Sequence, residues 1–343
     1  MTHGGMLTWS VFSLRLKHVF TIARGSRSVV PTVIVQFSRD GLTGYGEASP
    51  ISRYGETVET VGGFLERIGP ELPGDPTDIG AVMALLDRMS PGDSAAKAAV
   101  DIALHDWNGK RTGTPLWKSL GLKPGGKGST SITIGIDTPE AVERKVTEAT
   151  GFRALKIKAG VRLERDIVRS VRKMSRQPLR VDANEGWKSR EEALDAIRWM
   201  EAEGVELVEQ PLQAGNLRDV SWLRERVSVP LFADEDFGRE ADLEKLEGIY
   251  DGVNIKLMKS TGIREAVSAA RRAKKMGFRV MLGCMIESSV GTSAAAQISP
   301  LADVIDLDGS LLIDNDPFDG RVRPDGTILL GNEPGIGVRG DLA

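Results

Sequence analysis

The amino-acid sequence predicts an α/β fold, in which a (β/α)₈-type (modified TIM) barrel follows an N-terminal α+β capping domain. The chain has 343 residues, enough for one barrel and one smaller domain. From about residue 131 a short apolar strand alternates with an amphipathic helix, and this alternation is typical of a parallel sheet. Eight such strands indicate a closed barrel, although an open doubly wound sheet shares the local pattern.

The first 125 residues make up the predicted capping domain. Two segments rich in β-branched and apolar residues, Leu7–Leu14 and Val29–Phe37, are expected to be strands. A turn at residues 39–41 makes Leu42–Glu47 a hairpin partner. Ser94 is the expected N-cap of the last of three helices. These helices are predicted at Glu56–Ile68, Asp78–Met89 and Ser94–Arg111.

Residues 126–315 make up the predicted barrel, and the Gly- and Lys-rich segment 123–128 is the linker before it. The expected strands are Ser131–Gly135, Ala154–Lys158, Leu179–Asp182, Val205–Glu209, Leu231–Asp234, Gly252–Lys256, Arg279–Leu282 and Val304–Asp308. Amphipathic helices between them include Arg162–Met174, Ser189–Glu203 and Gly262–Met276. The Gly- and Pro-rich segment 316–343 is expected to fold back onto the capping domain.

The composition excludes several classes of function. The net charge is −3 and the isoelectric point about 5.8, so no basic excess is available to bind nucleic acid. Cys284 is the one cysteine, which fits a reducing cytoplasm. Neither a signal peptide nor a membrane span is expected, because charged residues interrupt the apolar runs. We therefore expect a cytoplasmic protein without nucleic-acid or membrane partners.

Acidic residues end three consecutive strands of the predicted barrel, at Asp182, Glu209 and Asp234. The active site of such a barrel lies at the C-terminal ends of its strands. A single acidic residue there is usually a helix N-cap, but three unpaired carboxylates converging in the mouth would repel one another strongly. A divalent cation resolves this repulsion. An all-oxygen ligand set without nearby Cys or His favours one Mg²⁺ per active site.

Two lysines, Lys158 and Lys256, end the second and sixth strands. Four steps around an eight-stranded ring make half a turn, so the two ammonium groups are expected to face each other across the mouth. One lysine, as a free amine, would remove a proton from a carbon atom, and the other would return one from the opposite face. Lys156 and the metal would lower the pKa of Lys158. The metal would also hold the substrate carboxylate and stabilise an enediolate.

Together these residues resemble the enolase superfamily, in particular its muconate-cycloisomerase-type subgroup. The segments that carry the resemblance lie in order on successive strands: Lys156–Lys158, Val181–Trp187, Val208–Pro211, Ala233–Glu235 and Asn254–Lys256. None is specific alone, whereas the ordered set is highly specific. The resemblance covers essentially the whole chain. It implies lysine bases acting with Mg²⁺, with Lys156 as a third lysine of the catalytic set.

Within this subgroup the chain is most similar to the dipeptide epimerases, above all the L-Ala-D/L-Glu epimerase type of murein peptide metabolism. Alternate residues of a strand point to one face, so Asp306 and Asp308 can both reach into the mouth, where an ammonium group is the expected complement. The resemblance implies that this is the α-ammonium group of a dipeptide. Ile22–Arg27 resembles a loop that covers the mouth, with Gly25 giving it the flexibility of a lid. The resemblance implies that Arg24 pairs with a side-chain carboxylate of the second substrate residue.

Other residues are expected near the site. Glu287 and Ser288 follow the seventh strand in a segment that resembles the family, and we expect both near the substrate. Asn184 and Glu235 are expected to orient ligands or a lysine. Thr261 is a departure, because the family more often has a Gly pair in this loop. We also expect the protein to be a homo-oligomer.

Several alternatives remain open or are set aside. A Ser/His/Asp hydrolase is not supported, because none of the three histidines lies at a strand end and no G-x-S-x-G motif is present. Cycloisomerases, o-succinylbenzoate synthases and N-acylamino-acid racemases share the two lysines and the three metal ligands, but they do not need an anionic pair on strand eight. A non-catalytic binding protein is hard to reconcile with a complete set of ligands and bases.

Overall fold

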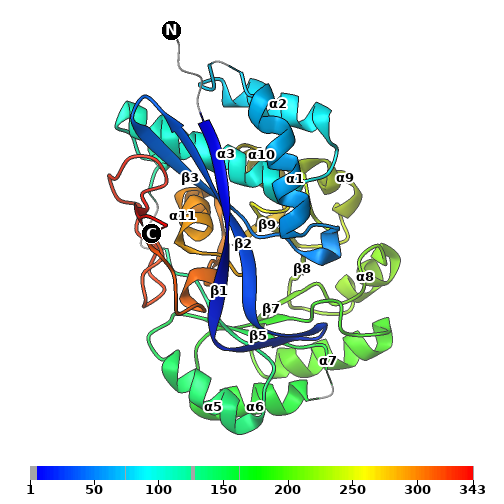
Figure 1. Cartoon of the computed structure of the whole chain (residues 1–343). Coiled ribbons are helices and arrows are strands. Elements are labelled where there is room, and N and C mark those ends of the chain that lie inside the picture. The colour runs from blue at the N-terminus through cyan, green and yellow to red at the C-terminus, as the bar shows by residue number, and fades with distance from the viewer. Residues whose placement is uncertain (1–5, 74, 125–127, 162, 343) are drawn as a thin grey trace.

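The computed structural model describes residues 6–73, 75–124, 128–161 and 163–342, and it confirms the predicted fold class (Figure 1). A three-stranded antiparallel sheet with its helices makes up the capping part, and eight parallel strands make up the barrel. One continuous apolar cluster joins the two, from Val33 and Ile34 in the first sheet to Val253 and Ile255 in the second. The two parts are therefore packed against each other through a shared core.

The capping sheet has the order β1 (Met6–Ile22), β2 (Gly25–Arg39), β3 (Leu42–Ala48). The first two strands are longer than predicted, and they form a ribbon whose turn reaches across to the region of β5 and α7 (Figure 1). The prediction ended at Leu14 because the ribbon beyond it is mostly exposed, so its sequence lacks a clear apolar alternation. The expected loop Ile22–Arg27 is a tight hairpin turn, with Ile22 paired with Gly25.

The capping helices are α1 (Val58–Ile68), α2 (Ile79–Met89), α3 (Ser94–Thr112) and α4 (Leu116–Ser119), with short 3₁₀ turns η1 (Ser52–Tyr54) and η2 (Gly69–Glu71). Helix α3 packs directly on β3, where a Cβ at Gly46 would lie 1.9 Å from the Ala99 carbonyl oxygen. The predicted N-cap at Ser94 is wrong by one residue, since Asp93 occupies that position. The helix start is instead capped by a residue far away in the sequence, because Glu56 accepts a hydrogen bond from Ala95 N at 3.0 Å.

The barrel strands follow one another around the sheet in sequence order. They are β4 (Ile132–Ile134), β5 (Leu155–Lys158), β6 (Leu179–Asp182), β7 (Val205–Glu209), β8 (Leu231–Ala233), β9 (Gly252–Lys256), β10 (Arg279–Gly283) and β11 (Val304–Asp306). Neighbouring strands pair in parallel. The first and last strands are tied by Ser131 N, which donates to Ile305 O at 3.2 Å, and by Leu307 N, which donates to Thr130 Oγ1 at 2.7 Å. These bonds leave the barrel nearly closed.

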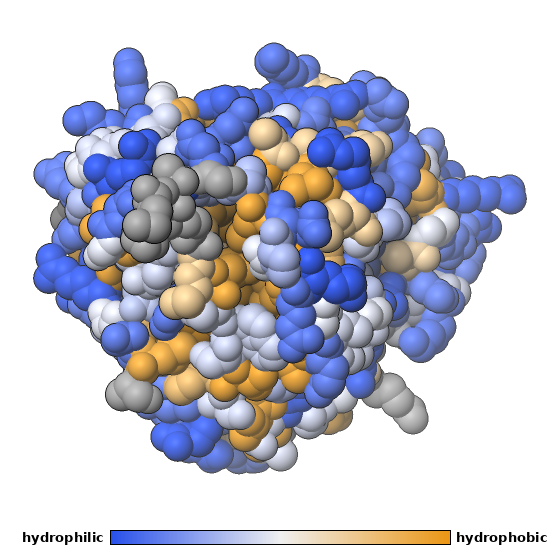
Figure 2. Space-filling view, turned by 45° about the horizontal axis from the view of Figure 1, so that its top comes forward, coloured by the Kyte–Doolittle hydropathy of each residue, from blue (hydrophilic) through white to orange (hydrophobic). Residues whose placement is uncertain are grey.

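Helices surround the barrel. They are α5 (Pro139–Glu148), α6 (Glu164–Met174), α7 (Arg190–Ala202), α8 (Leu217–Arg224), α9 (Leu243–Leu246), α10 (Ile263–Lys275) and α11 (Ser289–Gln297), with 3₁₀ turns η3 (Glu240–Asp242), η4 (Ser299–Leu301) and η5 (Gly309–Leu311). The predicted start of α6, at residue 162, lies outside the described residues. Among the described helices, none combines the length and apolar character that a membrane crossing requires. In Figure 2 hydrophilic residues dominate the rim of one face, and apolar residues gather near its middle.

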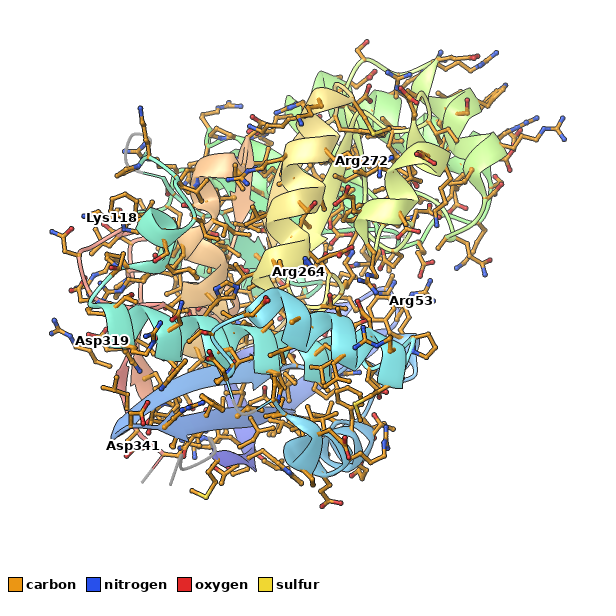
Figure 3. All side chains as sticks on the ribbon, turned by 90° about the horizontal axis from the view of Figure 1, so that it is seen from above. Arg53, Lys118, Arg264, Arg272, Asp319 and Asp341 are labelled. Atoms are coloured by element: carbon orange, nitrogen blue, oxygen red, sulfur yellow. The ribbon has the colours of Figure 1, made fainter. Side chains whose placement is uncertain are left out.

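The capping domain also holds the barrel by contacts between helices. Asp101 on α3 accepts a hydrogen bond from Ile263 N at 2.5 Å, at the start of α10. Figure 3 shows the next residue, Arg264, at this junction of α3 and α10. Gly262 has a φ of 111°, and a Cβ there would lie 2.4 Å from Asp101 Oδ2, so this position requires glycine. Helix α10 is thus capped by a carboxylate from the other domain.

The C-terminal segment contains β12 (Phe318–Asp319), which pairs with β13 (Arg339–Gly340). Between these two strands the segment contacts the capping helices. Leu116 N donates to Gly335 O at 2.9 Å, and Ile336 N donates to Asp106 Oδ1 at 2.9 Å. Asp341, labelled near the capping sheet in Figure 3, accepts a hydrogen bond from the Tyr45 hydroxyl at 3.1 Å. The segment therefore runs along the capping domain. The predicted domain boundary at 125/126 lies outside the described residues.

Candidate active site

A cavity of about 540 Å³ lies at the C-terminal ends of the barrel strands, under the β1–β2 ribbon. Its lining comes from both parts of the chain and includes Phe20, Arg24, Arg53, Tyr54, Lys156, Lys158, Asn184, Asp234, Glu235, Lys256, Asp306 and Asp308. The capping residues come from the ribbon and from η1, and the barrel residues come from strand ends and the loops after them. Most residues predicted for the site therefore line one cavity.

Asp182, Glu209 and Asp234 converge as the sequence predicted. All three side chains are buried, and one oxygen from each lies within 4.8 Å of the others. They are not unpaired, as the prediction assumed, because each faces a lysine. Lys158 Nζ lies 2.7 Å from Asp182 Oδ2, and Lys256 Nζ lies 2.8 Å from Asp234 Oδ2. The lysines therefore offset part of the negative charge that the prediction expected the metal alone to offset.

Lys156 occupies the centre of this charge cluster. Its ammonium group lies 2.7 Å from Glu209 Oε2, 2.7 Å from Asp306 Oδ2 and 3.2 Å from Asp182 Oδ2. Burial lowers the pKa of Lys156, but these three carboxylates raise it by more, so the net pKa lies well above its ordinary value. Lys156 is therefore a fixed cation. It contacts the same Asp182 oxygen as Lys158, which places the two ammonium groups side by side.

Two further residues around the three carboxylates were not predicted. Lys259 is buried, and its Nζ lies 2.6 Å from Asp234 Oδ1. Asn254 donates from Nδ2 to Glu209 Oε1 at 2.7 Å. The alternation of side chains along β9 could have indicated Asn254, since it lies two residues before Lys256 and so points to the same face. Lys259 lies in an irregular loop, where no period indicates the direction of a side chain.

The carboxylate cluster fits a divalent cation. Despite the lysines, burial and the charges of Asp182 and Asp234 raise the pKa of Glu209 to about 7. The cluster is thus still short of positive charge at Glu209. Three buried carboxylates within reach of one point, with no sulfur or imidazole ligand among them, are the donor set that Mg²⁺ prefers. Asp182, Glu209 and Asp234 are the residues that would hold it.

Lys158 and Lys256 lie on β5 and β9, four strands apart in the barrel order, and both face the cavity. The Phe20 ring of the ribbon lies 6.0 Å from Lys158 Nζ and covers it. Burial lowers the pKa of Lys256, but Asp234 and Glu209 raise it by more, so the net pKa lies above its ordinary value. A cation on those carboxylates would offset this effect, because it would take up part of their negative charge.

Asp306 and Asp308 both line the cavity, but they do not belong to one strand. Strand β11 ends at Asp306, and Asp308 precedes the 3₁₀ turn η5. The prediction that alternate strand residues place both carboxylates is therefore wrong in its reasoning. Asp306 accepts from Ser131 Oγ at 2.6 Å, and Asp308 accepts from Thr133 N at 2.6 Å. Burial and the nearby Asp306 raise the pKa of Asp308 to about 6.

Arg24 lies at the tip of the ribbon, and it is already paired within the protein. Its Nη1 donates to Asn184 O at 2.9 Å and lies 3.0 Å from Glu185 Oε2 and 2.8 Å from Glu235 Oε1. The expected pairing of Arg24 with a substrate carboxylate stays a prediction, since Arg24 lines the cavity. The hairpin turn and these contacts hold a side chain that was expected on a flexible loop. Asn184 and Glu235 do lie beside the metal ligands, as expected, and they contact Arg24.

Glu287 and Ser288 do not line the cavity, although they were expected near the substrate. Ser288 donates from its hydroxyl to Glu47 of β3 at 2.6 Å, and Gly291 N donates to the same carboxylate at 2.9 Å. Glu287 is buried behind them, and burial and the charge of Glu47 raise its pKa to about 8. This segment therefore anchors the capping sheet to the start of α11. The sequence could not indicate this, because Glu47 lies far away along the chain.

Thr261, the departure from the family pattern, has a φ of 53°. A β-branched residue rarely adopts this left-handed conformation, which costs on the order of 1–3 kcal/mol. The loop nevertheless brings Lys259 to Asp234 and presents Gly262 to Asp101. The threonine is accommodated in the conformation that a glycine would favour.

Comparison with known proteins identifies the family. Residues 7–121 match the N-terminal domain of the mandelate racemase / muconate lactonizing enzyme family, and residues 139–343 match the enolase C-terminal domain-like family. The chain belongs to the enolase superfamily. The predicted resemblance is thereby confirmed for both parts of this enolase-superfamily protein.

Its relatives include enzymes of more than one type. The chain is 46% identical over 333 residues to the L-Ala-D/L-Glu epimerase of Bacteroides thetaiotaomicron, which covers 97% of this chain and 87% of that protein. A dipeptide epimerase from Enterococcus faecalis, solved with Mg and L-Leu-L-Tyr, has a TM-score of 0.91 at 32% identity, covering 97% of this chain and 98% of its own. The N-succinyl Arg/Lys racemase from Bacillus cereus has a TM-score of 0.93 at 28% identity, covering 98% and 95%.

Proposed function

We propose that the protein is a Mg²⁺-dependent dipeptide epimerase, an isomerase that transfers a proton at the α-carbon of the C-terminal residue of a dipeptide. L-Ala-D/L-Glu is the proposed substrate, as in murein peptide metabolism. The observation that carries the proposal is the placement of Lys158 and Lys256 four strands apart around one cavity, with the carboxylate cluster on the strands between them. The names of the relatives support the substrate class.

The lysines perform the proton transfer. One lysine, as the free amine, takes the α-proton from one face of the carbon, and the other, as ammonium, returns a proton to the opposite face, so that the configuration inverts. Asp182, Glu209 and Asp234 would hold Mg²⁺, which would supply positive charge to bind the substrate carboxylate and to stabilise the negative charge that develops as the proton leaves. Phe20 shields Lys158 from water, and Lys156 holds Asp182, Glu209 and Asp306 in place.

The far end of the substrate is bound on the other side of the cavity. Strand β11, with Asp306, lies four positions from β7, with Glu209, in the barrel order. A dipeptide whose carboxylate lies at the metal cluster therefore extends its α-ammonium group towards Asp306 and Asp308. Their two buried carboxylates suit a cation. The racemase relative shows that the same fold also serves N-acylated amino acids. An acylated nitrogen carries no positive charge to pair with these two carboxylates, which would keep only their partners within the protein, Lys156, Ser131 and Thr133.

The proposal is tested by incubating the Mg²⁺-loaded protein in D₂O with a dipeptide library and with N-acylamino acids. We expect α-deuterium in the C-terminal residue of dipeptides, with inversion, and strongest for L-Ala-Glu. Incorporation into N-acylamino acids alone would replace the proposal with the racemase alternative. An absence of incorporation in any substrate, in a folded and Mg²⁺-bound sample, would favour a binding protein.

We also propose the organisation of the molecule that the sequence predicted. The capping domain spans residues 1–125, the barrel 126–315 and the returning segment 316–343. The two family matches, at 7–121 and 139–343, support a division between them. A homo-oligomer in the cytoplasm completes the proposal. Sedimentation of the purified protein would test the oligomeric state.

The Asp306→Asn variant should lose about 100-fold in kcat/KM for dipeptides, because the substrate ammonium group loses a buried charged partner. N-acylamino acids should lose much less, since they carry no ammonium group at that end. The change also removes a charge from beside Lys156, but that effect is common to both substrates and cancels in their ratio. The measurement is the ratio of the two kcat/KM values. Equal losses would remove the ammonium-binding role from Asp306.

A further inference from the structure

Behind the active-site cavity lies a second cavity of about 620 Å³, and Arg24, Arg53 and Asn184 line both. Glu185 lines the second cavity only. The two guanidinium groups thus form part of the wall between the cavities, with the Glu185 carboxylate on their far side. Figure 3 shows Arg53 where the capping domain meets the barrel.

Glu185 is held firmly in this position. Its Oε1 lies 2.5 Å from Arg53 Nη2 and accepts from Ala214 N at 2.8 Å, while its Oε2 lies 3.0 Å from Arg24 Nη1. Its backbone φ is 65°, which only a few per cent of non-glycine residues adopt. The side chain is 8% exposed, so solvent screens its charge only weakly. Glu185 is therefore a fixed counter-charge to the two arginines.

The wall has little net charge as a result. Arg24 and Arg53 carry two positive charges, and Glu185 and Glu235 carry two negative charges in contact with them. Arg27 also lines the active-site cavity, but it does not line the second cavity, so it is not part of this wall. Arg24 contacts Asn184 and Glu235, which follow two of the three cluster carboxylates in the chain. With a dipeptide bound as proposed, this wall would face the substrate residue whose carboxylate lies at the cluster.

We infer that Glu185 determines side-chain specificity by acting through Arg24 and Arg53, so that the enzyme accepts neutral as well as acidic C-terminal residues. This inference rests on the proposed function. Two unopposed arginines would strongly favour a side-chain carboxylate over an isosteric amide. With Glu185 behind them, the arginines can still donate hydrogen bonds into the cavity, but the Coulomb term that separates an acid from an amide is reduced.

The Glu185→Gln variant isolates this charge. The amide oxygen can keep the bonds from Arg53 and Ala214 N, while the amide nitrogen turns towards Arg24 and releases one of its contacts. Arg24 keeps Asn184 O and Glu235, so its position is preserved. The readout is the ratio of kcat/KM for L-Ala-L-Glu to that for L-Ala-L-Gln. We expect the variant to raise this ratio about tenfold, mainly through the KM of the acidic substrate.

Two further variants complete the test. Glu191→Gln removes an equal charge from an exposed residue of α7 paired with Arg190, and it should leave the ratio unchanged. Glu185→Asp keeps the charge and the fold but is too short to reach both arginines, so it should raise the ratio by a smaller factor. An unchanged ratio in both Glu185 variants, or an equal rise in the Glu191 variant, would overturn the inference. Failure of every protein to exchange any dipeptide would overturn the proposed function and this inference with it.

Discussion

Replacing either Lys158 or Lys256 with alanine should reduce epimerisation by at least about 10³-fold in both directions, since each direction needs one lysine as base and the other as acid. The two lysines line one cavity from β5 and β9, four strands apart. Loss of one therefore leaves one face of the α-carbon without a proton donor or acceptor. The remaining lysine can still exchange the proton that it faces. Each variant should then incorporate deuterium without inversion, into opposite epimers of the dipeptide.

Proton NMR of the α-position in D₂O, starting from each epimer in turn, separates exchange from inversion. Lys256→Arg is the sharper variant, because arginine keeps the positive charge beside Asp234 but cannot act as a base at neutral pH. It should fail like the alanine variant while remaining folded. Lys245→Ala, an exposed lysine paired with Asp242, is the matched control and should retain full activity. Near-normal epimerisation in either Lys158→Ala or Lys256→Ala would exclude the two-base scheme.

The sequence was informative wherever a functional residue ended a regular strand. Asp182, Glu209 and Lys256 each terminate a short apolar segment, so the strand period and the order of strands around the barrel place them without knowledge of any contact. The same logic failed at Asp308, because β11 stops two residues earlier and a 3₁₀ turn takes over. Both aspartates reach the cavity, but the second does so through its bond to Thr133 N.

Partners far apart in the chain could not be predicted in this way. Glu287 and Ser288 looked like site residues, yet the position of Glu47, on another domain, turns their segment into an anchor. Arg24 was correctly placed over the mouth, but its pairing with Glu185 and Glu235 depends on where the ribbon tip meets the barrel. Such contacts are set by tertiary packing, which no local period records. They are also the contacts that adjust charge at the site, and so they bear on specificity.

The metal cluster gives the other large expected effect. Glu209→Gln should weaken Mg²⁺ binding and lower kcat/KM by at least about 10³-fold, because it removes a charged ligand where negative charge must be stabilised. The change keeps the size of a side chain that is fully buried and bonded to Asn254 Nδ2. The amide oxygen of the variant can still accept this bond from Asn254, so the fold should be retained.

Two readouts test this prediction without relying on activity. Calorimetric titration should show tight Mg²⁺ binding in the unchanged protein and much weaker binding in the variant, and Mg²⁺ should raise the melting temperature of the unchanged protein alone. Glu206→Gln is the matched control on the same strand, since Glu206 is partly exposed and pairs with Arg180 away from the cluster. It should bind Mg²⁺ normally. If Glu209→Gln also bound Mg²⁺ with unchanged affinity, the three carboxylates would not be the metal site, and the lysines around them would have to stabilise the developing charge alone.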